Sequence, residues 1–119
     1  MTTGLNVNVR TTPAGPVIEL EGRLDHDTAP QAFALLPGLA LRPRQQLVVD
    51  LAHLTFCDSR GVSVFIAARN RALTAYATFV LTAVPEHVNR IFRMTGLARV
   101  FTTRTAPQSA ADDGSPPAG

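Results

Sequence analysis

The pattern of apolar and polar positions along the chain predicts strands and helices in alternation. Alternating or branched apolar runs indicate strands at residues 5–9, 17–22, 46–51, 77–84 and 100–102. Helical spacing begins after Thr28, after Ser59 and at Pro85. The order is therefore β-β-α-β-α-β-α-β, which predicts an α/β domain with a largely parallel sheet.

The first two helices carry more specific signals. Thr28-Ala29-Pro30-Gln31 has the spacing of a capping box. Pro37-Gly38 then leaves two possibilities, that the first helix ends there or that it kinks and continues toward Leu41. For the second helix we expect a buried apolar band and a separate polar or small stripe. The expected band is Val62, Phe65, Ile66, Ala72 and Leu73. The expected stripe is Arg60, Ser63, Ala67, Asn70 and Thr74.

Composition narrows the classes of function. A chain of 119 residues with 45% apolar side chains is the size of one domain with its own core. No apolar run is long enough for a spanning helix, so we expect no membrane partner. The basic residues are all Arg and lie scattered, with a formal net charge of +2, which argues against direct binding to nucleic acid.

Two further features bear on location and domain limits. The chain has one cysteine, Cys57, which cannot form an internal disulfide; this suits the cytoplasm. From Ala106 onward the residues are small, polar or proline. We therefore expect a folded domain over 1–105 and a disordered tail over 106–119.

The segment that leads into the second helix carries the candidate chemistry. Asp58 and Ser59 are typical N-cap residues, and Gly61 is a weak helix former, which we expect to leave the surface beside Ser59 open. A phosphate on Ser59 would meet the positive end of the helix and its N–H donors. Arg60 would add a charge-assisted bond or face a partner. The simpler interpretation is that Asp58 and Ser59 only cap the helix.

Enzymatic and metal-binding interpretations are weaker. Cys57 is followed directly by Asp58, whose charge raises a thiol pKa, so we expect Cys57 to be a buried apolar residue. Ser59 lacks the flanking glycines of a nucleophile elbow. Asp25-His26-Asp27 is more typical of a loop and cap than of a ligand set. We expect no catalytic residue, metal or cofactor.

Four segments of the chain match the motifs of a known family, and their order and spacing hold over about residues 5–104. They are residues 17–25, residues 47–51, residues 56–62, and Val84-Pro85 with residues 91–97. On these segments the chain resembles the STAS domain family, in particular the bacterial anti-sigma-factor antagonists. The resemblance implies a four- or five-stranded mixed sheet with helices mostly on one face.

The resemblance also implies a partner-switching role. In such systems the unphosphorylated antagonist binds an anti-sigma factor that is also a serine kinase, and the sigma factor is released. The kinase phosphorylates the antagonist, and a PP2C-like serine phosphatase removes the phosphate. The phosphoacceptor maps onto Ser59, and Asp25, Asp58, Arg60 and Gly61 map onto its surroundings. The implied partner surface consists of Asp25, Thr28, Ser59, Arg60, Ser63 and Asn70.

One residue departs from the family pattern. The family usually has Ser or Thr after the phosphorylated serine, whereas this chain has Arg60. An alternative is therefore a STAS adaptor of a stress-signalling or lipid-transport complex that works without phosphorylation. The polar stripe of the second helix would be the contact surface in either case, unless it is simply a solvated helix face.

Overall fold

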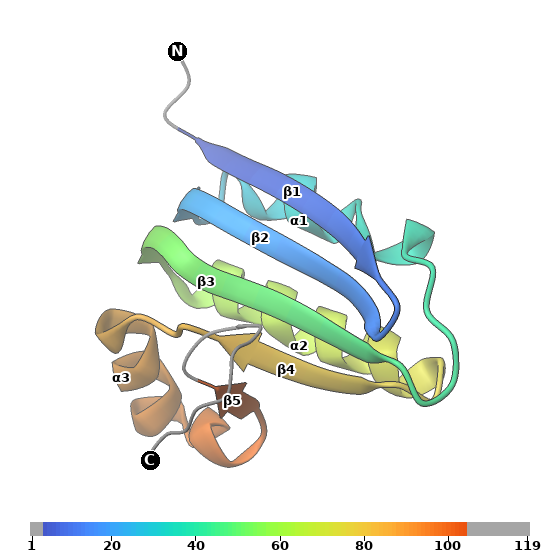
Figure 1. Cartoon of the computed structure of the whole chain (residues 1–119). Helices are drawn as coiled ribbons and strands as arrows, with labels where there is room; N and C mark the ends of the chain where they lie inside the picture. Colours follow the sequence, from blue (N-terminus) through green and yellow to red (C-terminus); the bar gives the residue numbers. More distant parts are fainter. Residues whose placement is uncertain (1–3, 105–119) are drawn as a thin grey trace.

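A computed structural model describes residues 4–104 of the chain (Figure 1), so the tail expected over 106–119 lies outside the described residues. Within that range the order of strands and helices is the predicted one. The strands are β1 (Leu5–Thr12), β2 (Gly15–Leu24), β3 (Gln46–Cys57), β4 (Thr78–Thr82) and β5 (Thr102–Arg104). The helices are α1 (Ala29–Phe33), α2 (Ser59–Thr74) and α3 (Glu86–Thr95), with 3-10 turns at Leu36–Gly38 and Leu97–Arg99.

The strands form one mixed sheet in the order β1-β2-β3-β4-β5. β1 and β2 are antiparallel and joined by a tight turn, whereas each later neighbour is parallel to the one before it. Parallel neighbours need a crossover, and helical segments supply it between β2 and β3, β3 and β4, and β4 and β5. The predicted mixed sheet is confirmed.

The helices share one hydrophobic core on one face of the sheet; Figure 1 shows α1 and α2 behind the strands. Leu47 and Leu51 of β3 and Phe65 of α2 are fully buried in this core. Phe65 meets Phe92 of α3 edge-on at a centroid distance of 6.2 Å, and Phe92 lies 5.0 Å from Phe101. The N–H groups of Val100 and Phe101 bond back to the carbonyl of Leu97, so the last strand begins at Thr102 and not at residue 100 as predicted.

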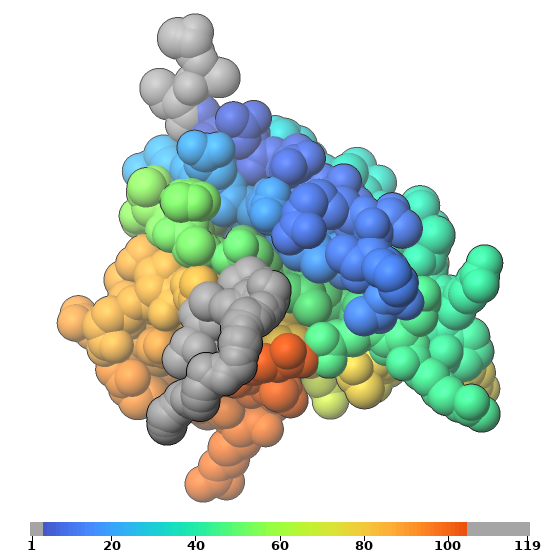
Figure 2. All heavy atoms as spheres, viewed as in Figure 1, coloured from blue at the N-terminus to red at the C-terminus, as the bar shows by residue number. Residues whose placement is uncertain are grey.

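The opposite face of the sheet carries no described helix and combines a polar row with buried valines such as Val48 and Val80. Asn8, Glu19 and Asp50 stand side by side across β1, β2 and β3, as the strand register requires. Figure 2, seen from this side, shows the strands β1 to β3 at the surface. The two faces of the sheet therefore differ in chemistry, as expected for helices confined to one side.

β3 is longer than the sequence pattern predicted. Residues 52–57 were expected to connect the central strand to the second helix, but the strand continues to Cys57. β2 keeps pairing with it as far as Leu24 opposite Cys57, after two register shifts. Irregular pairing of this kind disturbs the alternation of buried and exposed residues, which is why the sequence pattern ended too early.

The first helix differs from the prediction in its start and its length. Thr28 makes no side-chain cap, because its hydroxyl donates to the carbonyl of Arg23 at 2.8 Å. Gln31 Nε2 donates instead to the carbonyl of Leu5 at 2.9 Å. The expected capping box is therefore wrong. Of the two possibilities left open at Pro37, the helix ends, and it does so already at Phe33.

Candidate functional site

Ser59 is the first residue of α2 and lies exposed at the end of β3. Asp58 caps the helix: its Oδ1 accepts from the N–H of Gly61 at 3.0 Å. Its Oδ2 accepts from the N–H of His26 at 3.0 Å, which brings the β2–α1 loop beside the start of α2. One of the first-turn N–H groups expected to meet a phosphate on Ser59, that of Gly61, is therefore already bonded to a carboxylate.

Gly61 has a different role from the expected one. It is buried and faces the sheet, so it does not open the surface beside Ser59. A Cβ at this position would lie 2.5 Å from the carbonyl oxygen of Leu24 and 2.8 Å from the Sγ of Cys57. Glycine therefore allows the first turn of α2 to pack directly on the ends of β2 and β3.

The carboxylate of Asp25 is used within its own loop. Its Oδ1 accepts from the N–H groups of Asp27 and Thr28 at 3.0 and 3.1 Å, and Arg23 Nε lies 3.3 Å from its Oδ2. Partial burial raises the pKa of Asp25, but these hydrogen bonds outweigh it and hold the pKa below its usual value. Asp27 is the exposed acid of the loop, and its carboxylate has no hydrogen bond within residues 4–104.

Two arginines flank the site, each stacked on an aromatic ring. The guanidinium of Arg23 lies 4.2 Å from the ring centre of Phe56 at the end of β3. The guanidinium of Arg60 lies 5.3 Å from the ring centre of Phe33 on α1. Arg60 therefore links α1 to the start of α2, a contact that its position after Ser59 did not indicate.

The outward face of α2 combines polar and apolar residues. Ser63 is half-buried and Asn70 is exposed on this face, in agreement with the expected polar stripe. Ile66 and Leu73 were expected in the buried band, but they are 36% and 48% exposed, so this part of the prediction is wrong. At 100° per residue both lie almost in line with Ser59, opposite the sheet.

The structure brings some residues of the implied partner surface together and leaves others apart. Ser59, Arg60 and the 25–28 loop lie together at one end of the domain. The hydroxyl of Thr28 is engaged inside its loop, accepting from the N–H of Asp25 at 2.9 Å. Asn70 stands about 16 Å along the helix from Ser59. The bond from His26 to Asp58 left no signal in the sequence, because nearly every residue type offers the backbone N–H through which His26 acts.

Cys57 is buried and unsuited to catalysis. Burial, with a further contribution from the charge of Asp58, raises the pKa of its thiol to about 12. The reactive thiolate is therefore almost absent at neutral pH. The expectation that Cys57 is a buried small residue is confirmed.

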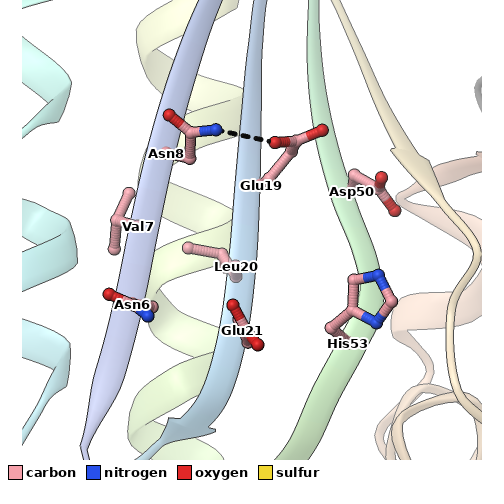
Figure 3. A pocket seen from close by; sticks show the side chains of 8 residues that line it. All are labelled: Asn6, Val7, Asn8, Glu19, Leu20, Glu21, Asp50 and His53. Atoms are coloured by element: carbon pink, nitrogen blue, oxygen red, sulfur yellow. Dashed lines mark hydrogen bonds between the residues drawn. The ribbon is translucent and has the colours of Figure 1, made fainter.

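A hollow of about 490 Å³ on the helix-free face lies apart from the candidate residues (Figure 3). It is lined by Asn6, Val7, Asn8, Glu19, Leu20, Glu21, Asp50 and His53. Glu19 accepts from Asn8 at 3.0 Å and pairs with Arg10 at 3.3 Å, so much of its charge is compensated. Within residues 4–104, no three His, Cys, Asp or Glu side chains are grouped to hold a metal ion.

Comparison with known proteins gives relatives by sequence and by structure. The chain is 28% identical over 84 residues to the anti-sigma-B factor antagonist of Listeria monocytogenes, covering 71% of this chain and 74% of that protein. The fold is similar to that of an anti-sigma-factor antagonist (STAS) domain protein from Planctomyces limnophilus, with a TM-score of 0.75 and 17% identity over 84% of this chain and 90% of that one.

A third comparison concerns a modified protein. The phosphorylated form of the Bacillus cell fate determinant SpoIIAA superimposes with a TM-score of 0.64 at 21% identity, covering 84% of this chain and 92% of that one. The names of these relatives describe regulators of transcription factors rather than enzymes. None of the helices within residues 4–104 has the length and apolar character needed to cross a bilayer.

The family model described as "Mlab, STAS domain" matches residues 7–103, which is nearly the whole of the described chain. The match includes the hairpin, the parallel strands, the 25–28 loop and α2 with Ser59 at its start. The sequence and the fold therefore agree, and the chain belongs to the STAS domain family.

Proposed function

We propose that this protein is a cytoplasmic anti-sigma-factor antagonist in a partner-switching pathway. Its unphosphorylated form binds an anti-sigma factor that is also a serine kinase, and the sigma factor is released. Phosphorylation of Ser59 ends this binding, and a PP2C-like serine phosphatase restores it. The names of the sequence relatives support the role, and the exposed position of Ser59 at the start of α2 is the observation that carries it.

The surroundings of Ser59 favour an electrostatic switch. A phosphate adds about −1.5 to −2 charges at pH 7. It would stand next to the carboxylate of Asp58, which occupies the N–H of Gly61 and bonds to the loop that carries the exposed acid Asp27. Arg60 and Arg23 offset part of the added charge, and the remainder opposes a docked partner through repulsion and desolvation. A penalty of about 2–3 kcal/mol would weaken binding roughly 30- to 150-fold.

The first experiment is mass spectrometry of the protein recovered from its own cells. A mass increase of about 80 Da on Ser59 is expected. Ser63 is the natural control, because it lies one turn along the same helix and its hydroxyl already donates to the carbonyl of Ser59 at 3.3 Å. Phosphate on Ser63 and none on Ser59 would contradict the proposal.

The second experiment tests binding with matched variants. S59A is expected to retain an anti-sigma factor on an affinity column under all growth conditions, and S59D is expected to lose it. T95A, at the end of α3 and outside the implied partner surface, is expected to bind as the unmodified protein does. Equal retention by S59A and S59D would exclude a charge switch at this residue.

A constitutive STAS adaptor is the second candidate. The observation that favours it is Arg60, because its long side chain, stacked on Phe33, occupies the position next to Ser59 where the family usually has a small hydroxyl residue. An unmodified Ser59 under several growth and stress conditions would select this function, in a stress-signalling or lipid-transport complex.

A further inference from the structure

Asp58 bonds to both segments that make up the candidate site. Its Oδ1 accepts from the N–H of Gly61 in α2, and its Oδ2 accepts from the N–H of His26 in the β2–α1 loop, both at 3.0 Å. The two partners are 35 residues apart in the chain but are held by one carboxylate. Each oxygen therefore ties a different element to the same residue.

The 25–28 loop is organised by its own hydrogen bonds and makes few of them to the rest of the site. Its internal bonds run from the N–H groups of Asp27 and Thr28 to Asp25, and from the hydroxyl of Thr28 to the carbonyl of Arg23. Within the described chain, the hydrogen bond that joins residues 25–28 to α2 or its cap is the one from His26 to Asp58. Both ends of the loop are also held, because the carbonyl of Leu24 accepts from the N–H of Asp58 at 3.3 Å and Ala29 is fully buried, so the bond from His26 sets the placement of the loop's tip beside Ser59.

We propose that Asp58 is a positioning residue that fixes the 25–28 loop against the start of α2. A partner then meets the loop and Ser59 as one preformed surface, which removes the cost of ordering the loop on binding. The statement about a partner rests on the proposed function, whereas the bridge from Asp58 to Gly61 and His26 does not. Capping alone, the usual role of an aspartate at this position, would not need the second oxygen.

The substitution D58N separates capping from bridging. The side-chain oxygen of Asn can still accept from Gly61, and Asn is a good N-cap, so the helix is retained. The amide nitrogen that replaces the second oxygen cannot accept from His26. D58S keeps a cap and is too short to form the bridge, which gives a second variant of the same kind. D27N is the charge-matched control, because the Asp27 side chain makes no hydrogen bond within residues 4–104.

The measurement is backbone amide hydrogen exchange by NMR on the full chain. In D58N and D58S the His26 amide is expected to exchange about tenfold faster or more, because its bond to a charged acceptor is lost. The amides of Asp27 and Thr28, which bond to Asp25, and those of the core are expected to keep their rates, and D27N is expected to change none of them.

Two outcomes would overturn the inference. One is a His26 rate within twofold of the unmodified protein in both variants, since the bridge would then not protect this amide. The other is a parallel acceleration of His26, Thr28 and core amides, because Asp58 would then act through global stability.

The binding arm uses the anti-sigma factor recovered with S59A. D58N is expected to raise the Kd of the complex with this anti-sigma factor about tenfold, and D27N is expected to raise it much less. Equal Kd values for D58N and the unmodified protein would refute the statement that a partner meets a preformed surface. If no anti-sigma factor is recovered, the proposed function fails, and the exchange rates decide the inference alone.

Discussion

Replacing Gly61 with alanine tests how closely α2 packs on the sheet. The new Cβ would lie 2.5 Å from the carbonyl oxygen of Leu24, 2.8 Å from Cys57 Sγ and 2.9 Å from Leu24 Cγ. The nearest of these atoms belongs to the backbone of β2, so it cannot move aside as a flexible side chain would. The same carbonyl accepts from the N–H of Asp58 at 3.3 Å, so moving it also disturbs the start of the helix.

The size of the effect follows from opposing contributions. Alanine in a helix is favoured over glycine by up to about 1 kcal/mol. Overpacking of a rigid site costs about 1–3 kcal/mol, and a weakened hydrogen bond costs about 1 kcal/mol more. The steric contribution is larger, so we expect G61A to lose about 2 kcal/mol of unfolding free energy. For a domain of this size that lowers Tm by roughly 8–10 °C.

Circular dichroism during urea and thermal unfolding measures this loss. G38A is the matched control, because a Cβ on Gly38 meets no atom within 4 Å, and we expect its stability to stay within about 0.5 kcal/mol of the unmodified protein. A G61A protein as stable as the unmodified one would refute the packing argument. A stabilised G61A would show that helix propensity outweighs the contact.

Two further predictions concern titratable groups. The pKa of Asp25 lies below its usual 3.8 in the folded protein, so the unfolded chain takes up the proton first as the pH falls through that value. The urea midpoint of the unmodified protein should therefore fall more steeply between pH 5 and pH 3 than that of D25N; parallel curves would contradict this. The thiol of Cys57, with a pKa of about 12, should react with a disulfide reagent at pH 8 at least about 100-fold faster in urea than in the native state. Equal rates would show that the thiol is accessible.

The sequence alone was sufficient for the order of the elements. Alternation in β1 and helical spacing after Ser59 depend on residues close together in the chain, and such patterns survive in any fold that buries one face of each element. The placement of Ser59 at a helix start followed from Asp58, because capping is a local interaction.

Features that depend on distant residues were decided by the tertiary structure. Ile66 and Leu73 are apolar yet exposed, because the sheet covers the opposite side of α2 and no described element packs on theirs. Thr28 and Gln31 have capping-box spacing, but they bond to Arg23 and Leu5 instead. The spacing of these two residues along the chain permits a capping box, but carbonyl groups of β1 and β2 lie within reach and accept their hydrogen bonds instead.

The site itself shows the same division. Asp58, Ser59 and Arg60 are consecutive in the sequence and could be identified as candidates from it. The sequence does not indicate that Asp58 accepts a hydrogen bond from His26 or that Arg60 stacks on Phe33. Those contacts exist because β2 and β3 run parallel, so their carboxyl ends deliver the 25–28 loop and the start of α2 to the same edge of the sheet. Local periodicity determines which elements form, whereas the pairing of strands far apart in the chain determines which side chains meet.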